Sequence, residues 1–318
     1  MATATLLLPA RERFAGQALP EGVARALGRA NLGGGALPGE RAQLLRHFEL
    51  LPRGWPVAAL TRQLDAGDAE LGAWLRADPA YVRPDINGAR LLATGEVLQL
   101  TQDDIDALLP ALRPLFGDAG FPIDAPSPSR WYVRLPREAK LPQFAEPQDA
   151  LGADLFEHLP GVDEDRPEGR RWRALLSEAQ VVLHNHPWNA RRLSQGKLPV
   201  NSLWFWGAGL LPDHVTSRHR RVHSDDVLVR ALANASGTTL TPLASPFMPP
   251  EEGAALYDLR ALRNFAWLAG DWLEPAILAL HAGGIDSLHL DCEDGAGYTL
   301  TRGQHWRFWR RPLRVLHA

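Results

Sequence analysis

The residues with the most evident capacity for chemistry lie at the end of an apolar segment at 285–292. His289, Asp291 and Glu293 are spaced by two, so they share one face of a strand. An imidazole and two carboxylates can hold a metal ion or exchange protons. The more ordinary interpretation is a strand end from which polar side chains emerge into solvent. Because ligands of open α/β sheets bind at the carboxyl edge of the strands, the triple remains a candidate site.

Two further histidine pairs have spacings found in metal sites. His219 and His223 are four residues apart, which on a helix places both rings on one face, as zinc sites require. The two arginines between them oppose a cation, so a solvated basic loop is the expected structure. His184 and His186 flank a single residue, but a proline follows and no third ligand is near. That pattern favours a structural or substrate-facing role.

A basic segment after this second pair suggests anion binding. Asn189, Arg192 and Lys197 could hold a phosphate or carboxylate, because arginine binds such anions through two parallel hydrogen bonds. His186 and Asn201 complete this candidate site. In the alternative interpretation, Asn189 and Arg192 cap and brace the turn before an aromatic strand. The residues alone leave both interpretations open.

The segment 305–314 interleaves aromatic residues with arginines, a composition that could stack on single-stranded nucleic acid and neutralise it. The net charge of −3 favours instead an amphipathic hairpin in which Trp306, Phe308 or Trp309 packs inward and arginine stems cover the edge. The chain has no Gly-x-Ser-x-Gly, no Cys-x-x-Cys and no dinucleotide fingerprint. The glycine-rich run 31–39 lacks the Gly-Lys-Ser/Thr ending of a phosphate loop.

The elements that must position these residues follow from the spacing of apolar side chains and from turn signals. Strands are expected at 4–8, 89–93, 97–100, 130–135, 201–206 and 285–292, with a hairpin at 297–316. Helices are expected at 21–29, 40–51, 56–75, 166–183, 225–235, 258–269 and 272–281. A further helix begins at the capping residue Thr101 and carries Ile105, Leu108 and Leu112 on one face. Residues 136–165, rich in Pro, Asp and Glu, suit a linker.

The fold expected from these elements is α/β. The strand at 201–206 runs into a glycine turn and is followed by a helix, which is the pattern of a parallel α/β unit. We expect a mixed, mainly parallel sheet with helices on both faces. Residues 1–77 and 141–318 would form this core domain, and 78–140 a small α+β insertion.

The segment 181–209 resembles the signature of archaeal-type cofactor-independent phosphoglycerate mutases, members of the alkaline phosphatase superfamily. Their pattern, His-Pro-x-Asn-x-x-Arg, Gly-Lys-x-x-x-Asn, an apolar strand and Gly-x-Gly, is matched by His186, Pro187, Asn189, Arg192, Gly196, Lys197, Asn201, Gly207 and Gly209. The aromatic stretch 201–207 is similar to that of RpfE-type regulatory proteins of xanthomonad-like bacteria, the nearest resemblance. The likeness implies a truncated alkaline-phosphatase-like core, and the strand order of 78–135 resembles the family's insertion domain.

The residues that mutase chemistry needs are missing. Where the family has a strand ending in Asp-Gly, this chain has Pro9-Ala10, and the family's nucleophilic serine has no counterpart between 30 and 80. The family's metal-binding Asp-x-x-Gly-His corresponds to 294–298, where Tyr298 replaces the histidine. Two-metal phosphoryl transfer needs roughly six ligands and an activated nucleophile, and of these Asp294 alone remains.

We therefore expect a non-catalytic, phosphoglycerate-mutase-like regulatory protein that binds a small anion or a protein partner, without a cofactor. The first alternative is a phosphatase or phosphomutase with relocated metal ligands. Those ligands would come from His219, His223, His289, Asp291 and Asp294. The second alternative is a nucleic-acid accessory protein, which the acidic net charge disfavours.

Composition fits a bacterial protein of the cytoplasm. The chain has 318 residues, of which 45% are hydrophobic and 22% charged, as in ordinary globular proteins. Its single cysteine excludes an intramolecular disulfide and suits a reducing compartment. No apolar run approaches the roughly 20 residues that a membrane span requires.

Overall fold

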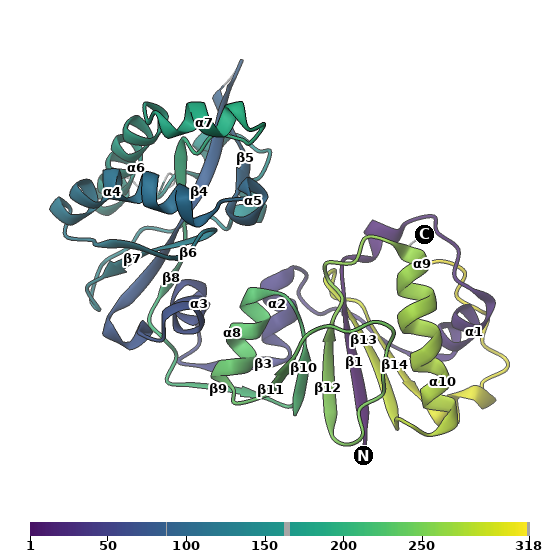
Figure 1. Ribbon diagram of the computed structural model, residues 1–318. Helices are drawn as coiled ribbons and strands as arrows, with labels where there is room; N and C mark the ends of the chain where they lie inside the picture. The colour runs from purple at the N-terminus through teal and green to yellow at the C-terminus, as the bar shows by residue number, and fades with distance from the viewer. Residues whose placement is uncertain (87, 162–165, 317–318) are drawn as a thin grey trace. The chain divides into compact units, whose positions relative to one another are not determined.

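The computed structural model describes residues 1–86, 88–161 and 166–316. The chain forms two compact units, each with a sheet of its own (Figure 1). Met1–Arg53 and Asp213–Ala318 form the first, called here the parallel-sheet unit. Gly54–Pro212 form the second, called the antiparallel-sheet unit.

The parallel-sheet unit contains nine strands in its described residues. They are β1 (Thr3–Leu8), β2 (Asn31–Gly33), β3 (Phe48–Leu51), β9 (His214–Ser217), β10 (Arg221–His223), β11 (Thr239–Thr241), β12 (Ala254–Asp258), β13 (Ser287–Cys292) and β14 (Gly297–Thr301). Its α-helices are α1 (Glu21–Arg29), α2 (Glu40–Leu45), α8 (Val227–Ala235), α9 (Phe265–Trp267) and α10 (Glu274–Ala282). The 3₁₀ turns η1 (Arg11–Phe14) and η6 (Arg302–Trp306) and the π-helix η5 (Leu268–Leu273) complete it.

Seven of these strands form one sheet in the order β11-β10-β12-β1-β13-β14-β2. The first five are parallel, and β14 and β2 are antiparallel to their neighbours. The expected mixed, mainly parallel α/β sheet is thus confirmed. Figure 1 shows α1 and α10 beside β13 and β14, and α8 beside β10 and β11.

One face of this sheet is an apolar core. Alternate residues of the central strands, among them Leu6 and Leu290, pack there with Val23 and Leu27 of α1 and Ile277 of α10. The burial of these side chains follows from the period of two in the strands and the spacing of three to four in the helices. The residues between them therefore point to the opposite face of the sheet.

The antiparallel-sheet unit is an α+β structure. Its strands are β4 (Ala73–Asp85), β5 (Gly88–Thr94), β6 (Ile123–Ser127), β7 (Arg130–Leu135) and β8 (Ser202–Gly209). Its helices are α3 (Val57–Ala66), α4 (Gln102–Asp118), α5 (Pro147–Ala150), α6 (Pro167–His184) and α7 (Trp188–Ser194), with 3₁₀ turns η2 (Ala69–Leu71), η3 (Gly95–Leu98) and η4 (Leu155–His158). The strands run in the order β5-β4-β7-β6, and β8 also pairs with β4.

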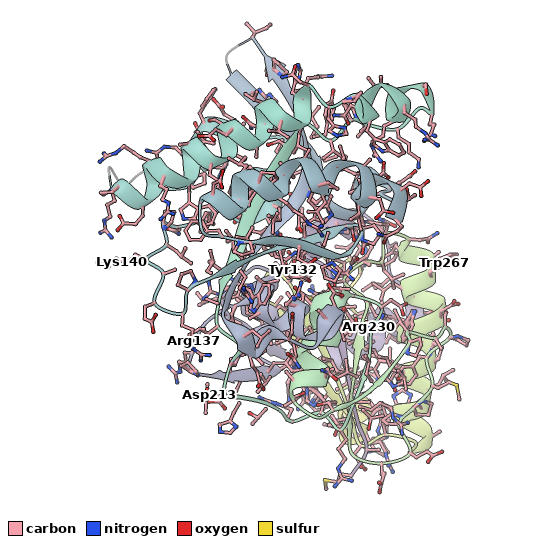
Figure 2. All side chains as sticks on the ribbon, turned by 60° about the vertical axis from the view of Figure 1, so that its left-hand side comes forward. Tyr132, Arg137, Lys140, Asp213, Arg230 and Trp267 are labelled. Carbon is pink, nitrogen blue, oxygen red and sulfur yellow. The ribbon has the colours of Figure 1, made fainter. Side chains whose placement is uncertain are left out.

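Two long helices bury the apolar side of this second sheet. Leu108 and Leu112 of α4 share one core with Trp172 of α6 and Phe205 of β8. Helix α4 begins as expected, with Thr101 in a capping box. Tyr132, labelled in Figure 2, is fully buried on β7.

The bounds of the two units differ from the expected division at 77 and 140. Segments 166–184 and 202–209, assigned from the sequence to the core domain, belong to the antiparallel-sheet unit because their apolar faces complete the core of α4. Strand β8 is antiparallel to β4, which corrects the parallel α/β unit expected there. The end of the helix expected at 56–75 is instead the start of β4.

Five local expectations are also corrected. Residues 48–51 form strand β3 rather than the end of a helix, and 95–98 form a 3₁₀ turn rather than a strand. The helix expected at 258–269 begins only at Phe265, because 254–258 is strand β12. The tail does not form a hairpin beyond Thr301, since a 3₁₀ turn follows β14. The linker expected at 136–165 contains α5 and η4, and its part at 162–165 lies outside the described residues.

The tail exposes its aromatic side chains instead of packing them inward. Trp306, Phe308 and Trp309 are 69%, 78% and 68% exposed. Among the described residues, no helix combines the length and the apolar character needed to cross a membrane.

Candidate functional site

The carboxyl edge of the parallel strands brings two aspartates close together. Asp258 of β12 and Asp291 of β13 both stand opposite Leu7 of β1, one on each side of that strand. Residues in register on neighbouring parallel strands share a face, so these carboxylates and Leu7 point the same way. The edge therefore holds acidic groups of the kind that bind metal ions in open α/β proteins.

Asp258 is paired with an arginine. Arg260 donates to both carboxylate oxygens of Asp258, at 2.7 and 2.8 Å. The same guanidinium lies 2.7 Å from Glu40 and 3.4 Å from Asp226. Ser224 donates to Asp258 Oδ2 at 2.8 Å. We call Glu40, Asp226, Asp258 and Arg260 the Arg260 cluster.

The other acidic residues of this edge also bind arginines. Arg46 pairs with Asp291 through two hydrogen bonds, at 2.9 and 2.6 Å. Arg11 donates to Asp294 at 2.7 Å and reaches the hydroxyl of Tyr298 at 3.5 Å. The tyrosine in the position of the expected histidine ligand therefore takes part in an arginine–carboxylate pair.

These donors do not fit a pair of divalent ions. Each aspartate at the edge already faces a guanidinium, whose fixed positive charge repels a cation. Within the described ranges, no three His, Cys, Asp or Glu residues are grouped so that they could hold one metal ion.

Asp291 also belongs to a second arrangement, a hydrogen-bonded chain of one carboxylate and two imidazoles. His47 Nε2 is 2.8 Å from Asp291 Oδ2, and His47 Nδ1 is 3.1 Å from His219 Nε2. Strand pairing explains why the two histidines meet. Phe48 of β3 is opposite Ser217 of β9 in an antiparallel pair, so His47, just before β3, lies beside the residues that follow β9.

Burial and nearby charge shift the pKa values at the two ends of this chain. Burial, together with the nearby His47 and Arg218, lowers the pKa of His219 to about 3, so its ring is neutral near pH 7. Burial would raise the pKa of Asp291, but the hydrogen bonds from Arg46 and His47 outweigh it and hold this pKa below its usual value. Either His47 Nδ1 or His219 Nε2 donates in the hydrogen bond between the two rings, which leaves His219 Nδ1 as the second nitrogen of its ring. Within the described part of the chain, that nitrogen is buried and has no hydrogen-bond partner.

The histidine chain lines a cavity of about 550 Å³ on the polar face of the parallel sheet. Thr5, Arg218, His289 and Thr299 also line it, together with main chain of the glycine-rich loop after β2. We call this the sheet-face cavity. His289 lies between Ser287 Oγ at 3.2 Å and Thr299 Oγ1 at 3.1 Å.

Of the residues expected from the sequence, the structure brings some together and separates others. His289 and Asp291 share a face, and His219 joins them in the sheet-face cavity. Asp294 lies in the turn after β13, paired with Arg11. His219 and His223 do not lie on a helix, because 221–223 is strand β10; His223 stacks on Tyr257 at 4.4 Å instead.

The candidate anion residues belong to the antiparallel-sheet unit, and most of their contacts are with other groups of that unit. The side chain of Asn189 bonds to main chain of Leu183 and Val200. Arg192, 1% exposed, donates to the carbonyls of Leu98 and Leu198 and pairs with Asp104 at 2.8 Å. These contacts support the structural interpretation of the two residues.

Two of the remaining members of that group, Asn201 and His186, also bond to main chain. Asn201 bonds to the main chain of Val82 through both side-chain atoms. His186 Nδ1 accepts from the amide of Trp188 at 3.2 Å. Lys197 is half-buried. Anion binding by this group stays a prediction.

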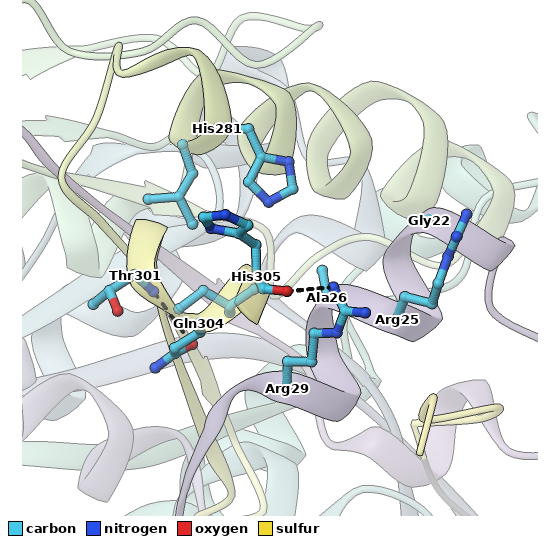
Figure 3. A pocket seen from close by; sticks show the side chains of 10 residues that line it. Gly22, Arg25, Ala26, Arg29, His281, Thr301, Gln304 and His305 are labelled. Carbon is cyan, nitrogen blue, oxygen red and sulfur yellow. Dashed lines mark hydrogen bonds between the residues drawn. The ribbon is translucent and has the colours of Figure 1, made fainter. Parts of the chain in front are cut away.

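A second, smaller hollow of about 250 Å³ lies between α1 and η6 (Figure 3). Arg25, Arg29, His281 and His305 line it. The ring of His305 lies 4.6 Å from that of the exposed Trp306. The hollow is thus lined by basic side chains, and it adjoins the first aromatic residue of the tail.

Sequence reasoning missed Arg46, His47 and Arg260. Arg46 and His47 fell inside a segment interpreted as helix. The segment instead ends in strand β3, whose pairing with β9 brings His47 to His219. The alternating pattern of β3, buried at Phe48 and Leu50, was a signal that could have revealed it.

Comparison with curated proteins finds matches over part of the chain. Over 87 residues, 27% of the chain, it is 38% identical to the probable 2,3-bisphosphoglycerate-independent phosphoglycerate mutase of Geobacter sulfurreducens. Over 66 residues, 21% of the chain, it is 41% identical to the corresponding mutase of Methanosarcina barkeri. The chain is a partial homologue of the cofactor-independent phosphoglycerate mutases. The matches span only 20% and 16% of those relatives' own lengths.

Two solved structures have a loose structural similarity to this chain. The cofactor-independent phosphoglycerate mutase of Thermoplasma acidophilum has a TM-score of 0.42 at 14% identity, over 94% of this chain and 89% of that one. The PH0037 protein of Pyrococcus horikoshii has a TM-score of 0.47 at 13% identity, over 94% and 87%. No family model matches the chain.

Proposed function

We propose that this chain is a non-catalytic, ligand-binding relative of the phosphoglycerate mutases with a regulatory role. The observation that carries the proposal is the pairing of Asp258, Asp291 and Asp294 with arginines of the same unit. In the relatives' reaction class, such carboxylates would instead hold divalent ions that clamp the attacking and leaving oxygens.

An arginine differs from a metal ion in what it does for a reaction. It is a fixed donor of hydrogen bonds that does not polarise a bound water into a nucleophile. Arg260 is held by three acidic residues, so displacing it with a metal ion would require breaking several charged hydrogen bonds at once. The site is thereby stable without metal.

The ligand-binding part of the proposal is supported by the sheet-face cavity. Its volume of about 550 Å³ falls within the range of small-molecule sites, roughly 300–1,000 Å³. The regulatory part is supported by the resemblance of the aromatic stretch 201–207 to RpfE-type proteins.

The test is a search for turnover by the full chain. Hydrolysis of p-nitrophenyl phosphate and interconversion of phosphoglycerates are measured with and without Mn²⁺, with the Methanosarcina barkeri mutase as the active control. We expect rates equal to those in buffer under all conditions. Metal-dependent turnover would overturn the proposal in favour of a phosphatase or phosphomutase.

The exposed aromatic tail favours a second candidate, a nucleic-acid accessory protein. Trp306, Phe308 and Trp309 are available for base stacking beside Arg307 and Arg310. This candidate predicts that the full chain binds a single-stranded oligonucleotide, measured by fluorescence anisotropy. Binding would weaken as salt rises and on replacing Arg307, Arg310 and Arg311 with glutamine. Binding that is absent at low salt would remove it.

A further inference from the structure

The sheet-face cavity has a polar floor where a parallel sheet is ordinarily apolar. On one face of β1 and β13, Leu6 and Leu290 belong to the core, while on the other face Thr5 and His289 line the cavity. Parallel strands buried on both faces are near-continuous in apolar residues. The hydroxyl and imidazole groups on this face are therefore a local departure from the fold's own pattern.

The cavity also holds an excess of positive charge. Its one lining carboxylate, Asp291, is neutralised by two hydrogen bonds from Arg46. Arg218, exposed at the rim, donates only to the main-chain carbonyl of Arg46, at 3.4 Å, and no acidic partner for it is found in the described residues. This second guanidinium is left to attract an anion.

A buried ring nitrogen in the wall still lacks a hydrogen-bond partner. His219 is 4% exposed and lines the cavity, and its Nδ1 is unpartnered in the described chain. An unmade hydrogen bond at a buried polar atom costs free energy, which a bound hydroxyl group would recover. Thr5, 5% exposed, adds a hydroxyl on the floor.

We propose that the sheet-face cavity binds a small polyhydroxylated anion, a sugar phosphate or a sugar acid. Arg218 pairs with the anionic group, and the ligand's hydroxyls bond to Thr5 and to the unpartnered ring nitrogen of His219. The inference deepens the proposed function, on which it rests, because it names the site and the chemical class of the regulatory ligand. The two sources of this chemistry differ in the anionic group alone, so the experiment includes both.

The experiment is isothermal titration calorimetry of the full chain without metal. Ribose 5-phosphate and gluconate are the probes, glucose supplies hydroxyls without charge, and inorganic phosphate and acetate supply charge without hydroxyls. We expect at least one probe to bind, and to bind at least tenfold more tightly than all three controls. Which probe binds identifies the source.

Two variants locate the binding site. Arg218→Gln removes the rim charge and should weaken binding by about tenfold or more, the effect of a hydrogen bond to a charged group. Thr5→Val keeps the shape of the side chain and should weaken binding by about threefold to tenfold. Arg220→Gln is the matched control, because Arg220 is an exposed arginine of the same segment that does not line the cavity. It should leave affinity unchanged.

The outcomes separate the inference from the proposed function. No binding by either probe, or binding that both Arg218→Gln and Thr5→Val leave intact, overturns the inference while the absence of turnover still supports a non-catalytic protein. Consumption of a probe by the wild-type chain, monitored in the same solutions, overturns the proposed function. Unfolding of Thr5→Val, checked by circular dichroism, would leave the decision to the exposed Arg218.

Discussion

At the scale of single residues, two features stand out: acidic side chains paired with arginines, and one buried histidine that stays uncharged near pH 7. Each aspartate at the carboxyl edge, Asp258, Asp291 and Asp294, is paired with an arginine. His219 is the contrary case: burial and nearby positive charge keep its ring uncharged. A buried histidine of this kind makes stability depend on pH, because it must be protonated in acid.

The His219 ring should make the parallel-sheet unit sensitive to mild acid. Its pKa is about 3 in the folded chain and 6.5 ordinarily, so between these pH values the unfolded state binds more protons. The free energy of unfolding therefore falls as pH drops from 6.5 toward 3, by at most about 1.4 kcal/mol per pH unit for this group. Urea unfolding at pH 7.0 and 5.0 measures the fall.

The His219→Gln variant should show a smaller fall between the two pH values. Some slope should remain, because the pKa values of His223 and His289 are also lowered by burial. An unchanged slope in the variant would show that His219 is charged or accessible in the folded chain.

At the scale of elements, one arginine links a strand end to two helices. Strand β12 ends at Asp258, and two residues later Arg260 folds back onto it and reaches α2 at Glu40. Asp226, the cap of α8, lies on the same guanidinium. The cluster joins one strand and two helices by charge, so its loss should affect stability before anything else.

Replacing Arg260 should convert the cluster into a site for cations. Arg260→Ala leaves three carboxylates uncompensated, with Asp258 buried, and should lower the free energy of unfolding by about 3–5 kcal/mol. Added Mn²⁺ should restore part of that loss in the variant, because hard oxygen donors bind it, and should not stabilise the wild type. Thermal unfolding with and without Mn²⁺ is the measurement.

Arg263→Ala is the control, since Arg263 lies in the same loop and donates only to main-chain carbonyls. It should behave as the wild type with and without Mn²⁺. Equal stability of Arg260→Ala and wild type would contradict the role given to the cluster.

The motif that carries the family resemblance should act through structure. Asp104 accepts hydrogen bonds from Thr101, at the start of α4, and from Trp188, and it pairs with Arg192. Arg192→Ala would leave this buried carboxylate without its cation and should cost about 3–5 kcal/mol in urea unfolding.

Arg191→Ala is the matched control in the same helix. Arg191 is exposed and stacks on the ring of Trp188 at 4.5 Å. Its loss should cost less than about 1 kcal/mol. Similar losses of unfolding free energy in the two variants would contradict a structural role for Arg192 and would favour a role in anion binding.

Local patterns predicted the elements well where one helix or strand supplied the whole signal. Helix α1 and strand β7 have the expected bounds, and α4 begins at its cap. The pairing of His289 with Asp291 on one face of β13 also followed from spacing. Contacts between distant segments could not be predicted this way. His47 meets His219 only because β3 pairs with β9, and no periodicity within one segment encodes that pairing.

At the scale of the whole molecule, the motif and the candidate site lie in different compact units. The antiparallel-sheet unit contains the family's sequence motif, held in place by buried contacts of Asn189 and Arg192. The parallel-sheet unit contains the arginine-paired acids and the sheet-face cavity. The chain thus combines partial homology to the mutases with a carboxyl edge whose aspartates are already paired with arginines.

The most direct test of this account is the metal content of the purified, untagged full chain. The protein is incubated with Mn²⁺ and Zn²⁺, dialysed, and measured by inductively coupled plasma mass spectrometry. The account predicts far less than one equivalent of either metal, because Arg11, Arg46 and Arg260 occupy the carboxylates. One or two equivalents that survive dialysis would contradict it and would place metal-dependent chemistry back at the carboxyl edge.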